Sequence, residues 1–294
     1  CVANGKILKE SGYKNIWIQP AAGDAGGAVG AALAYWFHEK SKKRNINKND
    51  SMKGSYIGSE YKNEFIKKKL EEKKMKYHFY NNNQLIKVLT ENLKKKKIIG
   101  LFQGRMEFGP RALGNRSIIA DPRDSKMQKK LNLKIKFRES FRPFAPAIIR
   151  EHLNKWFDLD YDSPYMLLVE KIKKSKRIKF NTQLFGIDLL NEKRSSVPAV
   201  THVDYTSRIQ TVHKSTNLFF YNLIQEFYKV TKCPILVNTS FNIRGEPIVE
   251  SPNDAIRCFL GTELDVLCLG NYLLYKNEQD KNKLTSYKSD FALD

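Results

Sequence analysis

The sequence has no apolar run approaching the roughly 18 uninterrupted residues that a membrane span needs. Its first residues also lack the charged start and apolar run of a secretory signal peptide. The chain opens on Cys1 rather than Met and enters a structured pattern at once. We therefore expect a cytoplasmic protein with no membrane partner, and a fragment whose N-terminal portion is missing.

Paired cysteine and histidine motifs are also lacking. The four cysteines, Cys1, Cys233, Cys258 and Cys268, show no C-x-x-C spacing, so neither a disulfide framework nor a zinc site is supported. Reduced thiols fit a cytoplasmic protein. No H-x-x-x-H occurs, no glycine-rich segment ends in the G-K-[ST] of a P-loop, and no internal repeat is visible.

Basic residues, by contrast, are in large excess: 52 Lys and Arg face 31 Asp and Glu, giving a net charge of +21. Such a charge is typical of proteins that bind nucleic acid or an anionic surface. Much of the excess lies in lysine-rich runs mixed with Asn and Ile, which is typical of solvated faces. The runs are residues 42–44, 67–69, 94–97 and 171–177. We do not expect nucleic acid as the partner, and a homodimer is left open.

Hydrophobic residues make up 41% of the 294 residues, enough for a sizeable core. Their spacing predicts helices over 60–76, 83–96, 126–134, 215–231 and 252–261. It predicts strands over 15–18, 98–102, 144–150, 165–172 and 234–237. This mixture, without a strict βαβ rhythm, indicates an α/β or α+β fold. Residues 39–54 are polar and indicate a linker, and 173–195 a surface excursion.

The first segment that carries chemistry is 104–117, which follows a predicted strand and holds three glycines and three arginines. Glycines let backbone N–H groups approach an anion, and guanidinium groups bind phosphate through two parallel hydrogen bonds. This pattern favours a phosphate site. The alternative is a tight turn with surface arginines, in which Glu107 pairs with one of them.

The second segment, 134–146, is basic and aromatic. If it is a strand, alternation places Lys134, Lys136 and Arg138 on one face. Phe137, Phe141 and Phe144 would then anchor it in the core. Two prolines restrict the backbone around Arg142, which lowers the entropy lost on ligand binding. The alternative is a basic edge strand protected by its lysines.

The third region is split between 198–210 and 237–247. The first part holds His202, Asp204 and Arg208, and the second holds Asn238, Ser240 and Arg244. His202 near Asp204 is compatible with a metal ligand or a general base, but a histidine held by a neighbouring hydrogen bond is commoner. Clustered guanidinium groups repel one another, so these segments together favour a shared anionic ligand.

At these residues the chain resembles the carbamoyltransferase family that includes nodulation and antibiotic-pathway O-carbamoyltransferases. The resemblance runs over nearly the whole chain. Its matching stretches are PAAGDAGGAVGAAL (20–33), GRMEFGPRALGNRS (104–117), KFRESFRPFAP (136–146), PAVTHVDYTSRIQTV (198–212) and NTSFNIRGEPIV (238–249).

The resemblance implies two catalytic units. Residues 1–40 would be the last piece of an actin-like ATPase-superfamily domain that transfers the carbamoyl group. Residues 41–54 would be a linker, and 55–290 a YrdC-like α/β domain. The second unit would form carbamoyl-adenylate from ATP and carbamoyl phosphate, for attack by a hydroxyl of a small-molecule or glycan acceptor.

The resemblance also implies site residues. Arg111, Lys136, Arg142, Arg208 and Arg244 match ligands of carbamoyl phosphate and ATP, with catalysis assigned to Lys136 and Arg142. His202, Asn238 and Ser240 would complete the substrate site, and ATP would bind with Mg²⁺. Asp24 matches a ligand of Fe²⁺ or another divalent metal, whose remaining ligands are absent from this chain. Tyr205 stands where a smaller residue is expected.

Two other functions stay open on the sequence alone. One is a threonylcarbamoyl-adenylate-type enzyme of tRNA modification, which the net charge favours slightly. The other is a non-catalytic nucleic-acid-binding module, which predicts steeply salt-dependent binding to RNA or DNA. The matching stretches fit the O-carbamoyltransferases better than either alternative.

Overall fold

A computed structural model describes residues 1–45, 50–179, 183, 186, 189, 192–284, 287 and 290–291. Residues 46–49 of the predicted linker and part of the predicted excursion 173–195 lie outside this described part. Within it, no helix combines the length and the apolar character needed to cross a membrane.

The described residues form one mixed sheet of nine strands in the order β1-β9-β8-β2-β3-β7-β4-β6-β5. The strands are β1 (His78–Phe79), β2 (Ile99–Phe102), β3 (Arg116–Ala120), β4 (Ala145–Ile149), β5 (Leu168–Lys171), β6 (Thr206–Val212), β7 (Ile235–Ser240), β8 (Val266–Leu269) and β9 (Tyr272–Tyr275). β2 pairs with β8, and β4 with β6, in parallel; the other neighbours are antiparallel. The predicted mixed α/β architecture is confirmed.

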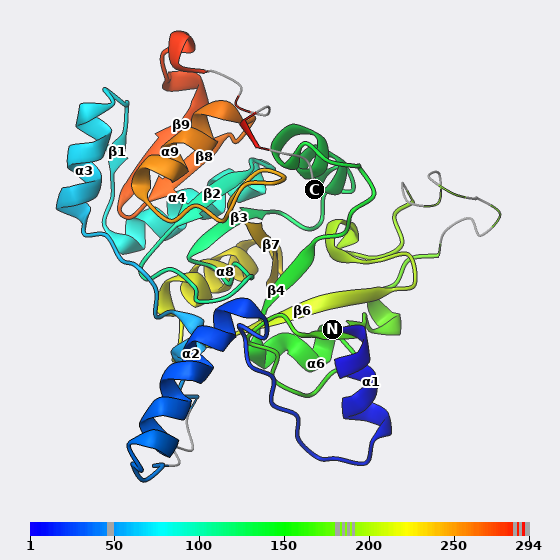
Figure 1. The fold of residues 1–294 in the computed structure, drawn as a ribbon. Helices are drawn as coiled ribbons and strands as arrows, with labels where there is room; N and C mark the ends of the chain where they lie inside the picture. Colours follow the sequence, from blue (N-terminus) through cyan, green and yellow to red (C-terminus); the bar gives the residue numbers. More distant parts are fainter. Residues whose placement is uncertain are drawn as a thin grey trace.

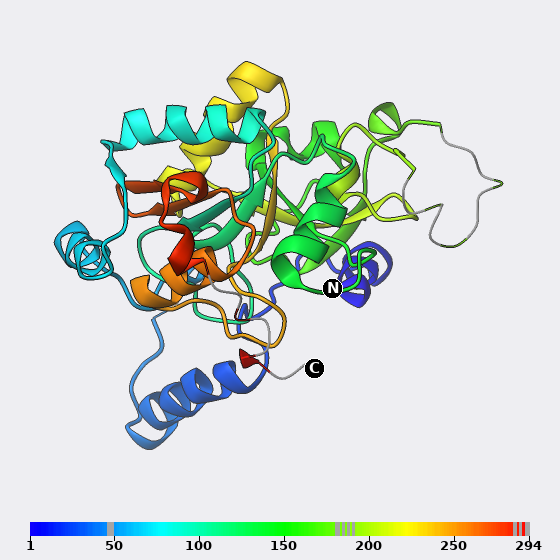
Figure 2. The same ribbon diagram turned by 90° about the horizontal axis from the view of Figure 1, so that it is seen from above.

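Two pairs of helices enclose this sheet (Figures 1 and 2). On one face α4 (Asn82–Lys94) packs against α8 (Leu218–Thr231), and on the other α9 (Pro252–Gly261) lies over β8 and β2 with α3 (Asn63–Glu72) beside it. The sequence defines where α4 and α9 begin, because Asn81 and Ser251 each form a capping box with the residue three positions later. Apolar side chains spaced three or four residues apart then face the sheet.

The remaining helical elements complete the described chain. They are α1 (Val2–Glu10), α2 (Asp24–Ala34), α5 (Met127–Lys130), α6 (Leu153–Trp156), the π-helices η1 (Tyr35–Glu39) and η3 (Leu131–Lys136), and the 3-10 helices η2 (Lys53–Ser55), η4 (Arg150–His152), η5 (Lys174–Lys176), η6 (Pro198–Val200), η7 (Lys276–Glu278) and η8 (Lys281–Lys283). In η2, at the end of the predicted linker, Gly54 and Ser55 are buried.

The N-terminal segment contacts the sheet through α1. The Asn4 side-chain amide donates to the Leu167 carbonyl at 3.0 Å, and Lys9 forms an ion pair with Glu170 of β5. Further along, α2 projects away from the sheet with none of its residues buried (Figure 1). The described contacts of this segment with the sheet domain therefore come from α1 and residues 16–21, and not from α2.

The predicted strand at 15–18 is wrong. These residues have no ladder partner, and Trp17 is 67% exposed. The Tyr161 hydroxyl instead accepts from the Ile16 N–H at 3.0 Å and donates to the Ile16 carbonyl at 2.8 Å. One side chain thus satisfies backbone groups that a strand would have paired.

The predicted strand face at 134–138 is also wrong. Helix α5 continues directly into η3, which ends at Phe137 in the left-handed region (φ 49°). Helical spacing turns Lys134 to the surface, where it pairs with Glu263, and buries Lys136. Of the three predicted aromatic anchors Phe144 is buried, Phe137 is partly buried, and Phe141 is 51% exposed.

Candidate active site

A cavity of about 230 Å³ opens where three neighbouring strands meet. Because β7 runs antiparallel to β4, and β6 parallel to β4, the end of β7 lies beside the beginnings of β4 and β6. The cavity is lined by Pro110, Arg111, Ala112, Arg138, Pro143, Phe144, Ala145, Met166, His202, Arg208, Asn238, Thr239 and Ser240. Five predicted site residues therefore meet here: Arg111, His202, Arg208, Asn238 and Ser240.

The arginine-rich loop 104–117 is organised around a buried carboxylate. Glu107 accepts the backbone N–H groups of Leu113 and Asn115 at 2.6 and 2.8 Å. Burial raises the pKa of Glu107, although these hydrogen bonds oppose the shift. Gly114 has a φ of 121°, and a Cβ there would lie 2.4 Å from the Phe220 ring. The alternative in which Glu107 makes a surface pair with an arginine does not describe this loop.

The same loop also touches the N-terminal segment. Gly109 has a φ of 130°, and a Cβ at this position would lie 3.1 Å from the Pro20 carbonyl oxygen. Glycine therefore allows the two backbones to approach closely, two residues before Arg111.

The three arginines of the loop have different environments. Arg116 is fully buried, donates to the Gln103 carbonyl at 2.8 Å and lies 3.5 Å from the centroid of the Phe102 ring. Burial lowers the pKa of Arg116 to about 10. Arg105 is exposed and pairs with Glu60. Arg111 alone of the three lines the cavity, so Arg105 and Arg116 support the loop rather than the site.

Three guanidinium groups surround the cavity. Burial lowers the pKa values of Arg111 and Arg208, and the charge of Arg208 lowers that of Arg111 further. Arg208 donates Nε to the Met166 carbonyl at 2.8 Å, and neither arginine forms an ion pair within the described residues. The third, Arg138, donates Nε to the Asn132 side-chain oxygen at 2.7 Å. Sequence reasoning did not assign Arg138 to the site.

The cavity wall also carries neutral polar groups. Asn238 is 1% exposed and donates to the Ala112 carbonyl and to the Gln210 side chain at 3.0 and 2.7 Å, whereas its Oδ1 has no partner. The Nδ1 atom of His202 lies 3.0 Å from Thr206 Oγ1, and burial lowers the histidine pKa. The imidazole is therefore neutral at neutral pH. It faces the cavity as a hydrogen-bonding group.

Lys136 lies beneath this wall and does not line the cavity. It is 2% exposed, and its Nζ donates to the Ser240 carbonyl and to the carbonyl and side-chain oxygens of Asn242. Burial lowers the pKa of Lys136 to about 7. The side chain thus fixes the turn after β7, from which Ser240 faces the cavity.

Arg142 and Arg244 lie outside the residues that line the cavity. Both form an ion pair with Glu139: Arg142 Nε lies 2.9 Å from Oε2, and Arg244 Nη1 lies 3.3 Å from Oε1. Burial, together with their charges, lowers the pKa of Arg138 to about 10, and Arg142 directly precedes Pro143, which lines the cavity. The predicted cations therefore form an inner group in the cavity and an outer group around Glu139.

Asp24 and Tyr205 do not line the cavity. Asp24 is exposed in the first turn of α2, and the described residues contain no cluster of three His, Cys, Asp or Glu side chains fit for a metal. This part of the chain does not form a complete metal site. Tyr205 has a φ of 65°, a conformation that favours glycine, which gives a physical reason to expect a smaller residue. Its ring lies under the Arg177 guanidinium at 4.7 Å.

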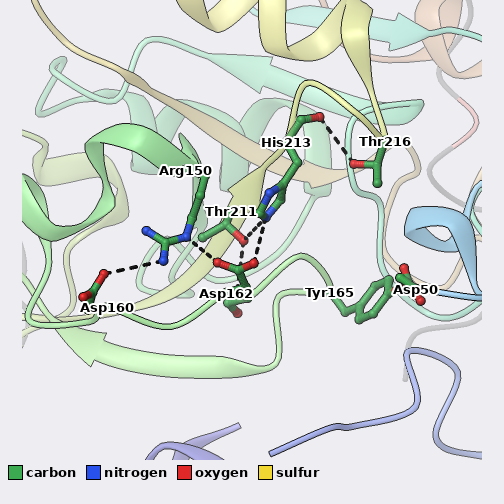
Figure 3. Close-up of polar contacts among 9 residues, drawn as sticks. Asp50, Arg150, Asp160, Asp162, Tyr165, Thr211, His213 and Thr216 are labelled. Carbon is green, nitrogen blue, oxygen red and sulfur yellow. Dashed lines mark hydrogen bonds and ion pairs between the residues drawn. The ribbon is translucent and has the colours of Figure 1, made fainter. Parts of the chain in front are cut away.

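A second cavity of about 380 Å³ lies beside residues 16–18 and is lined by carboxylates (Figure 3). Arg150 lies between Asp160 and Asp162 and pairs with both. Asp50 accepts from the Tyr165 hydroxyl and from the Gly54 N–H. These acids have partners, and their charge is wrong for a phosphate, so we take the arginine-lined cavity as the candidate active site.

Comparison with known proteins fits this choice. The model of the carbamoyltransferase C-terminus matches residues 90–276, which include the whole cavity lining. The model of the carbamoyltransferase N-terminus matches residues 1–33.

Individual relatives agree with the family models. Protein sll1178 of Synechocystis sp. is 50% identical, over 100% of this chain and 49% of that protein. Nodulation protein NolNO of Sinorhizobium fredii is 38% identical, over 94% of this chain and 38% of that protein. The 3'-hydroxymethylcephem-O-carbamoyltransferase of Streptomyces clavuligerus is 32% identical, over 62% of this chain and 31% of that enzyme. The chain thus spans half or less of each relative, and it belongs to the carbamoyltransferase family.

Proposed function

We propose that this chain carries the adenylate-forming part of an ATP-dependent O-carbamoyltransferase. The observation that carries the proposal is the pair Arg111 and Arg208, which share a cavity without an ion-pair partner among the described residues. Two guanidinium groups repel each other unless an anion lies between them. Carbamoyl phosphate and the triphosphate of ATP are anions of the required kind.

The proposed reaction has two steps. Carbamoyl phosphate first loses its phosphate to water, which leaves carbamate. A carbamate oxygen then bonds to the α-phosphorus of ATP, and the bond from that phosphorus to the β-phosphate bridging oxygen breaks. The products are carbamoyl-adenylate, pyrophosphate and phosphate. Cations fixed around the phosphates stabilise the charge that develops on the leaving pyrophosphate.

We assign roles from the geometry. Arg111, Arg138 and Arg208 bind phosphate oxygens, because they line the cavity. The neutral His202 and Asn238, both of which line the cavity, bind the uncharged carbamoyl end, whose NH₂ group donates hydrogen bonds. Lys136 acts from beneath, by holding Ser240 and the turn that follows it.

The transfer step would need residues beyond this chain. We propose that Asp24 supplies one carboxylate to a divalent metal such as Fe²⁺, with the other ligands outside the chain. Mg²⁺ would enter with ATP. The acceptor would be a hydroxyl of a glycan or small molecule. The name of the Streptomyces clavuligerus relative, a hydroxymethylcephem O-carbamoyltransferase, supports a hydroxyl acceptor.

The test is pyrophosphate release by the purified protein with ATP, Mg²⁺ and carbamoyl phosphate. We expect release only when all three are present. We propose that Arg142, which precedes the cavity residue Pro143, also binds a phosphate oxygen. The Arg142→Ala variant should then lower the rate about tenfold or more, because hydrogen bonds to a charged group are worth roughly 1.5–3 kcal/mol. Absence of release by folded protein would reject the proposal. Release with threonine and bicarbonate in place of carbamoyl phosphate would favour the threonylcarbamoyl-adenylate alternative.

A further inference from the structure

The outer cations share one carboxylate. Glu139 contacts Arg142 through one oxygen, at 2.9 Å, and Arg244 through the other, at 3.3 Å. A second contact fixes this arrangement, since the Arg244 N–H donates to the Lys136 carbonyl at 3.2 Å. The segments 136–142 and 240–244 are therefore joined both by backbone and by Glu139.

The carboxylate and a phosphate would compete for the same groups. Both anions offer a pair of oxygens that fit the planar guanidinium group. Arg138 lines the neighbouring cavity, and so does Pro143, the residue that directly follows Arg142. A phosphate chain extending out of the cavity past Arg138 would thus reach the arginines that Glu139 now holds.

Replacing the Glu139 carboxylate by a phosphate should cost little free energy. The side chains of Glu139 and Arg142 are 42% and 39% exposed, whereas that of Arg244 is 18% exposed. Ion pairs between exposed groups are weak because water screens them. Glu139 therefore pairs only weakly with Arg142, and its contact with the less exposed Arg244 at 3.3 Å is longer than that with Arg142.

We propose that Glu139 is an internal substitute for the substrate's phosphate. It holds Arg142 and Arg244 in position while the site is empty, and a phosphate group of the incoming substrate displaces it. This inference rests on the proposed function, because it requires a phosphate substrate in the adjoining cavity. It assigns to Glu139 a role in setting the strength of phosphate binding, not in the chemical step.

The experiment measures binding of inorganic pyrophosphate to the purified protein by calorimetry. The variants are Glu139→Gln, which keeps the side-chain shape but removes the charge, and Glu139→Asp, which keeps the charge but is too short to reach both arginines. The matched control is Glu151→Gln, which makes the same change in net charge. Glu151 lies beyond the other end of β4 and accepts from the Tyr221 hydroxyl at 3.0 Å.

We expect Glu139→Gln to bind pyrophosphate about two- to tenfold more tightly than wild type, because two weak competing ion pairs are lost. The affinity of Glu139→Asp for pyrophosphate should lie between those of wild type and Glu139→Gln. Glu151→Gln should match wild type, and the difference should shrink in high salt.

Equal or weaker binding by folded Glu139→Gln would overturn the role of Glu139 while leaving the proposed function intact. Equal tightening by Glu151→Gln would also overturn it, since net charge alone would then suffice. Failure of wild type and variants alike to bind pyrophosphate would reject the phosphate site itself, and with it both proposals. Binding by Glu139→Gln alone would support the substitution of carboxylate for phosphate most strongly.

Discussion

The two cavities contrast in how their charges are balanced. The larger one, beside residues 16–18, holds carboxylates that have partners in Arg150, Tyr165 and backbone N–H groups. The smaller one holds three guanidinium groups that make no ion pair within the described residues. Volume does not identify the ligand site in this molecule. Charge left uncompensated is the better guide to a ligand, because a protein that keeps like charges together gains from an opposite charge that arrives with the ligand.

The strongest test of this contrast replaces one arginine in each cavity with alanine. Arg208→Ala should weaken pyrophosphate binding about 10- to 100-fold, because hydrogen bonds to charged groups contribute about 1.5–3 kcal/mol. Arg150→Ala should leave this affinity unchanged, since Arg150 serves two aspartates of the protein itself. Calorimetric titration of both variants measures the two effects. Similar losses in both would show that the contrast between the cavities has no functional meaning.

A second test concerns the loop that presents Arg111. Gly114→Ala should destabilise the protein by about 2–4 kcal/mol, because the new Cβ would be both strained and in conflict with the Phe220 ring. The matched variant Gly12→Ala has a positive φ but no atom within 4 Å of the new Cβ, so it should cost about 1 kcal/mol. Urea unfolding gives both values. A Gly114→Ala cost no larger than that of Gly12→Ala would mean that the loop is not held by packing.

The smallest expected effect is a dependence on pH. Because burial lowers the pKa of His202 in the folded state, the unfolded chain binds its proton more readily. The free energy of unfolding should fall as the pH drops below about 6.5, the pKa of an unperturbed histidine, until the folded-state pKa is passed. The His202→Gln variant should lose less unfolding free energy than wild type as the pH falls, and we expect the difference to be less than about 1 kcal/mol. Urea titrations at several pH values measure the free energy of unfolding, and His38→Gln is the control at an exposed histidine. An identical dependence of stability on pH for wild type and His202→Gln would contradict a buried neutral imidazole.

Residue type and order predicted the part of the site that lies on strand ends. Asn238 and Ser240 lie at the end of β7, whose first part was predicted as the strand 234–237, whereas β6, which carries Arg208, was not predicted as a strand. The pairing of β7 and of β6 with β4 brings these strand ends together. The glycine-rich loop likewise identified the region of Arg111. Which of the three loop arginines faces the cavity was not predictable, because that choice depends on Glu107 and on contacts with Phe102 and Phe220.

The segment 131–142 illustrates the limit of pattern analysis. Alternating Lys and Arg favoured a strand, but the helix that begins at α5 continues through Lys136. Lys136 was therefore placed in the site by resemblance and by charge, whereas burial beneath Ser240 depends on the helical path of the chain. Arg138 was missed because its neighbours Lys134 and Lys136 have the same charge and only the fold distinguishes them. The site roles of Lys136, Arg142 and Arg244 stay predictions.

The close approach of Gly109 to Pro20 has a mechanical consequence. Where two main chains touch with no side chain between them, a shift of one is passed to the other almost undiminished. Arg111 follows two positions later, so a displacement of residues 20–21 would also press on the backbone that carries this arginine.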